Sequence, residues 1–324
     1  MKKPILSIVL VWSILWVCTS CDKETHLQST IIEGLTLDNY PKIDGSTSTA
    51  PLNRIIACKL LGINYKWVNH YSNLKEVQPK LNQTNSAKFN EQIKSSQTHQ
   101  SIIHLIDKET DLILSARTMS PDEKAHADAA GVTLIEIPIA LDAFVFIVNP
   151  ENEIKSLTTQ QVQDIYTGKL TNWKEVGGRD AEINAYVRNA NSGSQELMET
   201  LVMKDLDISQ FPESPFELMA FSMTGAFEVV DGNKDAICYT VYYYKEHIIT
   251  YTPVRSIAID GVTPNKTSIA NKSYPYVAEV YAVSAPIWTD RPWHIRSIAG
   301  FRQRQESKPS RKADIFLIKA QSFV

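Results

Sequence analysis

The chain has 324 residues, of which 43% are hydrophobic and 21% charged, which is ordinary for a globular protein of one or two domains. The formal net charge is −3, so the chain lacks the basic excess typical of nucleic-acid-binding proteins, and we expect no nucleic acid partner. Any anion bound by this chain must therefore be held by a local site.

The first twenty residues are typical of an export signal. Lys2 and Lys3 precede an apolar or small run over residues 4–17, which is shorter than the roughly 20 residues that a membrane-spanning helix needs. The small residues before Cys21 resemble a bacterial lipoprotein signal, which implies cleavage after residue 20 and lipidation of Cys21. The alternative is a plain secretory signal. Residues 21–36 are expected to form a tether.

A first hydroxyl-rich turn, residues 46–49, follows a predicted strand end at Ile43 and opens a helix with Pro51 in its first turn. A second such turn, residues 94–99, precedes an apolar stretch over residues 102–106. Each turn is expected to place unpaired N–H groups and hydroxyls at a helix start.

Short apolar stretches between the helices are predicted strands: residues 111–117, 134–150, 183–187, 236–244 and 254–259. The second stretch reads as two runs around Leu141-Asp142, and its later part, continuously apolar, is typical of a buried parallel strand. Strands alternate with helices, which favours an α/β architecture with largely parallel sheets. Cys58 and Cys238 could form a disulfide or remain two buried thiols.

The functional interpretation of the chain starts from the stretch between Arg188 and Lys204. This stretch consists of an arginine, the turn Asn191-Ser192-Gly193-Ser194, and a helix whose apolar residues form one stripe. Ser192 or Ser194 can cap that helix, and Gly193 allows close approach of the backbone to an anion. Taken alone, this pattern also fits an ordinary capped helix with a surface arginine.

Arg117 and Arg188 stand beside predicted strand ends, where open α/β sheets bind ligands. If the three turns converge, their N–H and O–H groups and two guanidinium groups form a cage for a small oxyanion such as phosphate. No nucleophile elbow, zinc motif or cysteine pair accompanies them, so we expect no enzyme, no metal and no cofactor.

Several motifs occur together and in order: DGSTSTAPL from Asp44, NWKEVGG ending at Gly178, Arg188 with NSGS, and IDGVTP from Ile259 followed by SYP. With them, the region from Ile43 to about Trp288 resembles the phosphate-type solute-binding proteins of bacterial ABC transporters, in the periplasmic binding protein-like superfamily. The resemblance implies an α/β, two-lobe (type II) fold with a hinge. Lobe I would comprise residues 37–141 and 245–289, and lobe II residues 142–244.

The resemblance also implies the residues that hold the ligand: Thr47, Ser48, Ser96, Thr98, Arg117, Arg188, Ser192, Gly193 and Ser194. Members carry aspartate or arginine at the position of Arg117, and an aspartate there would accept the proton of hydrogen phosphate. Members also commonly have a Gly-Ser-Gly turn before the helix that starts here, where this chain has Ser95-Ser96-Gln97-Thr98.

The implied function is a lipid-anchored, extracytoplasmic protein of the bacterial envelope that captures phosphate or a similar oxyanion and delivers it to an ABC transporter permease. An alternative is an anion-sensing or scaffold lipoprotein of the same fold. A phosphate-ester hydrolase would need a base or metal beside Ser192, which the sequence does not offer.

Residues 290–324 do not resemble the closing helix and Gly-Tyr-x-Pro segment of the family. If the tail is back-translated and read from the third base of the Asp290 codon, allowed codon choices can encode a different sequence that resembles this closing segment. We therefore predict that this tail is read in a shifted frame, with a divergent C-terminus as the alternative.

Overall fold

The structure is a computed structural model that describes residues 31–285, except residues 33, 71–73, 191, 209–218, 221 and 251–252. The predicted signal, the lipidation site at Cys21 and the tail from residue 290 lie outside the described residues. Within the described part, no helix is both long enough and apolar enough to cross a membrane.

The elements of the first half of the chain are β1 (Ile43–Gly45), η1 (Thr47–Thr49), α1 (Ala50–Leu61), β2 (Tyr65–His70), β3 (Leu74–Pro79), α2 (Gln83–Gln92), α3 (Thr98–Ile106), β4 (Leu112–Ser115), α4 (Pro121–Ala129), β5 (Ile135–Val148), β6 (Ser156–Leu157) and α5 (Thr159–Tyr166). Those of the second half are η2 (Trp173–Val176), β7 (Asn184–Ala185), β8 (Val187–Arg188), α6 (Gly193–Leu197), η3 (Met198–Met203), β9 (Met219–Ala220), α7 (Gly225–Gly232), β10 (Ala236–Val241), η4 (Tyr244–Ile248), β11 (Arg255–Ser256), β12 (Ala258–Ile259), α8 (Lys266–Ala270) and β13 (Val277–Ser284).

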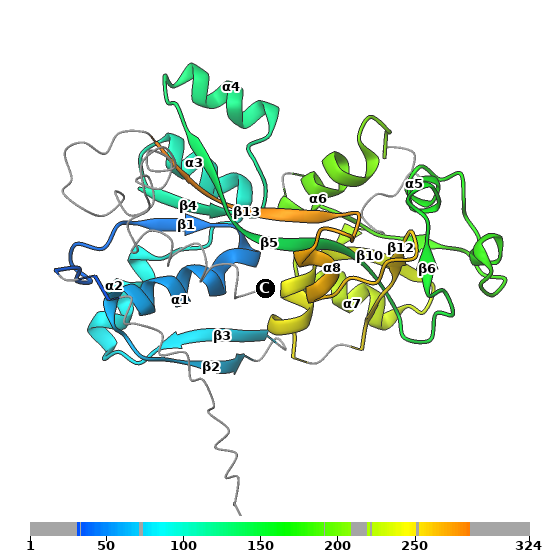
Figure 1. Ribbon diagram of the computed structural model, residues 1–324, viewed down its shortest axis with the longest axis horizontal. Helices are drawn as coiled ribbons and strands as arrows, with labels where there is room; N and C mark the ends of the chain where they lie inside the picture. Colours follow the sequence, from blue (N-terminus) through cyan, green and yellow to red (C-terminus); the bar gives the residue numbers. More distant parts are fainter. Residues whose placement is uncertain are drawn as a thin grey trace, which may run out of the picture.

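One lobe is built on β1, β4, β13 and the first part of β5, with helices on both faces. Successive residues of β4 point to opposite faces: Leu112 and Leu114 pack in the cluster that contains α1 and Phe89 of α2, whereas Ile113 packs with Ile102 of α3. The strand is therefore buried on both sides. In Figure 1, α1 to α4 gather around this part of the sheet, and the β2–β3 hairpin lies apart from it, below α1.

The long strand β5 joins this lobe to the second one. Its residues up to Ala143 pair with β13, and its residues from Phe144 to Val148 pair with β10. The partner strand thus changes directly after Ala143, next to Asp142. The Asp142 carboxylate accepts hydrogen bonds from the N–H groups of Ala143 (2.8 Å) and Tyr243 (3.0 Å). Asp142 links the two chain segments at this crossing, and burial raises its pKa to about 6.

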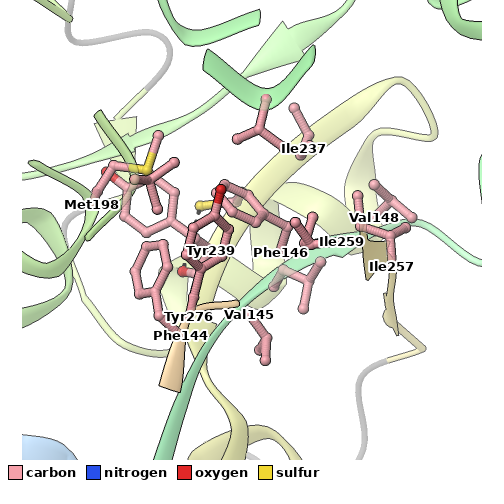
Figure 2. Packing of buried hydrophobic residues seen from close by; sticks show 14 of the residues in the cluster. Phe144, Val145, Phe146, Val148, Met198, Ile237, Tyr239, Ile257, Ile259 and Tyr276 are labelled. Atoms are coloured by element: carbon pink, nitrogen blue, oxygen red, sulfur yellow. Dashed lines mark hydrogen bonds between the residues drawn. The ribbon is translucent and has the colours of Figure 1, made fainter. Parts of the chain in front are cut away.

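The second lobe surrounds a core that is rich in aromatic rings. Phe144 and Phe146 of β5 pack against Tyr239 of β10, with ring centroids 5.1 and 6.2 Å apart, and Tyr276 lies beside Phe146 (Figure 2). Residues 254–276, expected in lobe I, instead lie with this core. Here β11 pairs with the second part of β5, β12 pairs with β6, and Ile269 of α8 is fully buried in the same cluster.

Several expectations from the sequence require correction. The main sheet, ordered β1-β4-β13-β5-β10-β7, is mixed and not largely parallel, because β13 runs antiparallel to β4 and β5, and β10 antiparallel to β5. The two runs in residues 134–150 form one strand. The expected strand 236–244 ends at Val241, after which the chain turns into η4. Cys58 and Cys238 are both buried free thiols, each in a different core.

Candidate functional site

A cavity of about 160 Å³ lies where three helix starts meet. These are η1 leading into α1, the first turn of α3, and the first turn of α6. The cavity is lined by Ser46, Thr47, Ser48, Gln97, Thr98, Ala116, Arg188, Ser192, Gly193, Ser194, Leu197, Ser222, Met223 and Val241. Among these described lining residues there is no carboxylate, histidine or cysteine, so the wall is rich in hydrogen-bond donors and carries the charge of an arginine.

The wall from the first lobe is a set of hydroxyl and N–H groups. Ser46 Oγ accepts from the N–H of Ala116 (2.9 Å) and shares a hydrogen bond with Thr98 Oγ1 (2.9 Å). This pair of hydroxyls has two protons, and only one lies in their mutual bond, so one remains for a ligand. Thr47 and Ser48 occupy the first positions of a helical segment, where the main-chain N–H groups have no partner within the helix.

Gln97 precedes α3 with φ +73° and ψ 165°, in the half of backbone space that favours glycine. It stands in the segment for which the resemblance implies a Gly-Ser-Gly turn. Strained backbone of this kind costs on the order of 1–3 kcal/mol and is concentrated at ligand sites. The observed strain therefore agrees with a role for this turn in the cavity wall.

Arg188 is the charged side chain of the cavity wall. It is buried, with 5% of its surface exposed, and burial lowers the pKa of its guanidinium group. Its main-chain N–H donates to Tyr239 Oη (2.9 Å) and Gln195 Oε1 (3.1 Å), and its Nη1 donates to the Met223 thioether (3.4 Å). A cation buried in this way is stabilised when an anion binds beside it.

The turn after Arg188 meets the first lobe across the cavity. Ser192 caps α6, because its Oγ accepts from the N–H of Gln195 (3.0 Å). Gly193 follows and lies against Thr98 so closely that a Cβ on it would be 2.4 Å from Thr98 Oγ1. The two lobes are thus in contact at this point, which is a closed arrangement. Ser194 Oγ lies 3.7 Å from Met223 Sδ.

Seven of the nine residues expected in the ligand site line this cavity, and two do not. The side chain of Arg117 is buried and makes two hydrogen bonds with Glu123, Nη1 to Oε2 (2.7 Å) and Nη2 to Oε1 (2.8 Å). His99 Nδ1 also contacts Glu123 (2.9 Å). The charge of Arg117 is therefore paired within the first lobe. Ser96 directs its main-chain N–H to Asp44 Oδ1 (2.8 Å).

Sequence reasoning missed several residues of the site. Asp44 is buried and holds the turn before α3, since its Oδ1 accepts from Gly45 and Ser96 and its Oδ2 contacts His104 Nδ1 (2.8 Å). Its position directly before Gly45-Ser46 is the available signal. Met223 lies in a segment without a recognisable motif, so no pattern could have indicated that it reaches Arg188.

Comparison with known proteins gives three findings. Residues 71–293 match the PBP superfamily domain. The chain is 28% identical over 250 residues to the phosphate-binding protein PstS of Staphylococcus epidermidis, covering 75% of this chain and 67% of that protein. It is 30% identical over 154 residues to the phosphate-binding protein PstS of Bacillus subtilis, covering 48% of this chain and 47% of that protein.

Solved structures have the same fold. A Clostridium perfringens protein with bound phosphate aligns with a TM-score of 0.57 at 23% identity, covering 88% of this chain and 96% of that one. An ABC-type phosphate transport receptor from Vibrio cholerae aligns with a TM-score of 0.54 at 21% identity, covering 86% and 97%. The predicted two-lobe α/β fold is confirmed.

Proposed function

This chain belongs to the PBP superfamily, and we propose that it is a substrate-binding protein that captures phosphate, or a similar small oxyanion, for an ABC transporter. The cavity between the lobes carries this proposal. Hydroxyl and main-chain N–H donors from residues 46–48, Thr98 and residues 192–194 converge there with the buried guanidinium group of Arg188. The relatives that are named phosphate-binding proteins support phosphate as the ligand.

The proposed binding step follows from this chemistry. The anion enters between the open lobes and accepts hydrogen bonds from the guanidinium and N–H groups of the second lobe. The first lobe then closes over it. Closure brings Thr98 against Gly193, so that donors from both lobes surround the ligand. Charge-assisted hydrogen bonds make Arg188 the strongest single contact in this arrangement.

Calorimetry with protein purified without phosphate tests the assignment. Arg188→Ala removes a charge-assisted donor at a buried site, so we expect phosphate binding to weaken by about 2–4 kcal/mol, or roughly 30- to 1000-fold. Arg179→Ala is the matched control, because Arg179 lies in the same lobe and pairs with Asp235 away from the cavity lining. If both variants bind phosphate as the parent does, the site assignment is wrong.

The same proposal includes export by residues 1–20, a lipid anchor on Cys21 at the outer side of a bacterial membrane, and delivery to a transporter permease. The lobe division is also part of it: residues 37–141 form lobe I and 142–244 lobe II. β11 pairs with the second part of β5 and β12 pairs with β6, which supports placing residues 254–276 with lobe II. β13 pairs with β4, which supports placing β13 in lobe I. The shifted frame from Asp290 remains a prediction, which the gene sequence decides.

A further inference from the structure

A methionine sulfur lies in the wall of the anion cavity. Met223 Sδ accepts from Arg188 Nη1 (3.4 Å) and lies 3.7 Å from Ser194 Oγ. Both of these residues line the cavity, and so does Met223 itself, which is half-buried. The thioether therefore sits against two donors that the proposed function assigns to the anion.

A thioether suits this place because it is a weak hydrogen-bond acceptor. An arriving oxyanion accepts far more strongly, so it takes the donors of Arg188 and Ser194 with little competition from the sulfur. The same arrangement is sensitive to oxidation. Methionine sulfoxide is polar and carries an oxygen on the sulfur, where the donors of these two residues are already directed.

We propose that Met223 is an oxidation site and that its sulfoxide closes the cavity to the anion. Hydrogen peroxide is the oxidant. The sulfur lone pair attacks one peroxide oxygen, the S–O bond forms as the O–O bond breaks, and the leaving hydroxide takes the remaining proton to give water. The sulfur loses two electrons and the peroxide gains them. The new oxygen then accepts from Arg188 and Ser194 in place of the anion. This inference rests on the proposed function.

Access distinguishes Met223 from other methionines of the chain. Met198 and Met203 are fully buried in the second lobe, and Met119 is 9% exposed in the first. Met223 borders a cavity wide enough for a peroxide molecule, which is little larger than water. We therefore expect Met223 to be oxidised before these three.

The experiment treats the full chain with hydrogen peroxide, assigns the added oxygen by peptide mass mapping, and measures phosphate binding by calorimetry. Oxidation of Met223 is expected to weaken phosphate binding by about tenfold or more, and a methionine sulfoxide reductase is expected to restore it. Met223→Leu should show the same affinity before and after treatment. Met219→Leu, which removes a methionine of the same segment, should lose affinity on treatment as the parent does.

Three outcomes would overturn the inference: Met223 escapes oxidation while buried methionines react, the oxidised parent binds phosphate unchanged, or Met223→Leu stays as sensitive as the parent. Failure of the proposed function looks different. In that case the untreated parent does not bind phosphate at all, which is recorded before any oxidant is added.

Discussion

Gly193→Ala tests whether the closed arrangement of the lobes is the one that holds the ligand. Gly193 opens α6 in the second lobe and faces Thr98, the first residue of α3 in the first lobe. A Cβ at Gly193 would lie 2.4 Å from Thr98 Oγ1, closer than the 3.0 Å that real Cβ contacts respect. The added methyl group must therefore keep the lobes apart or turn the Thr98 side chain.

Either response costs free energy in the closed state. Turning Thr98 breaks its 2.9 Å hydrogen bond with Ser46, worth about 0.5–1.5 kcal/mol. If the lobes instead close with Thr98 in place, the added methyl group overpacks the contact, as in a filled core, which costs about 1–3 kcal/mol of free energy in the closed state. We expect phosphate binding to weaken by about 1–3 kcal/mol, or roughly 5- to 150-fold. In the open state the methyl group has no such neighbour, so the melting temperature without phosphate should change little.

Calorimetry and thermal unfolding measure these two quantities separately. Thr98→Ala removes the clashing Oγ1 and leaves Cβ at 3.4 Å, so Gly193→Ala should cost less in that background than in the parent, as a double-mutant cycle can show. Gly232→Ala is the matched control, because its Cβ would meet nothing within 4 Å. If Gly193→Ala binds phosphate as tightly as the parent, the contact between Gly193 and Thr98 does not belong to the bound state, and the reasoning fails.

Two further predictions concern stability and anchoring. Glu123→Gln leaves the buried charge of Arg117 without its carboxylate, so denaturant titration should show a loss of about 3–5 kcal/mol. Burial raises the pKa of Glu123, but the hydrogen bonds and charge of Arg117 outweigh it and the net pKa is lowered. The stability from this pair is thus complete above about pH 4.3 and declines as the pH falls through the lowered pKa, a decline that Glu123→Gln should lack. Cys21→Ala should release the protein from membrane fractions; unchanged fractionation would exclude the lipid anchor.

The convergence of the site was predictable because each wall carries a local signal. The hydroxyl-rich turns at Thr47 and Ser192 both precede helices, and in an α/β fold such turns gather at the ends of strands. The role of Arg117 was not predictable in the same way. A strand end places it near the site, but its side-chain direction depends on Glu123, six residues later. The capping box from Ser120 to Glu123 was a partial signal, since it fixes Glu123 at the start of α4.

The lobe assignment of residues 254–276 shows a different limit of prediction from sequence: short strands do not reveal their partners. β11 and β12 are two-residue strands, and their partners are Ile147 and Val148 of β5 and Ser156 and Leu157 of β6. No periodicity in so short a segment identifies a partner strand. The change of partner within β5 is hidden for a related reason: residues 143–148 are all buried, so the apolar pattern does not reveal which strand lies beside them.

Because Arg117 pairs with Glu123, its positive charge is not directed at the cavity. With Arg117 neutralised inside the first lobe, Arg188 is the cation among the described lining residues, and the remaining donors are neutral hydroxyl and N–H groups. In the proposed function, a doubly charged oxyanion would then be held by one full positive charge and by the dipoles of neutral donors. These donors come from both lobes, with Ser46 and Thr98 in the first and residues 192–194 in the second, so they surround an anion together only when the lobes are closed. We therefore expect affinity in this chain to depend on closure, so the Gly193–Thr98 contact, although it carries no charge, should affect binding on a scale approaching that of Arg188.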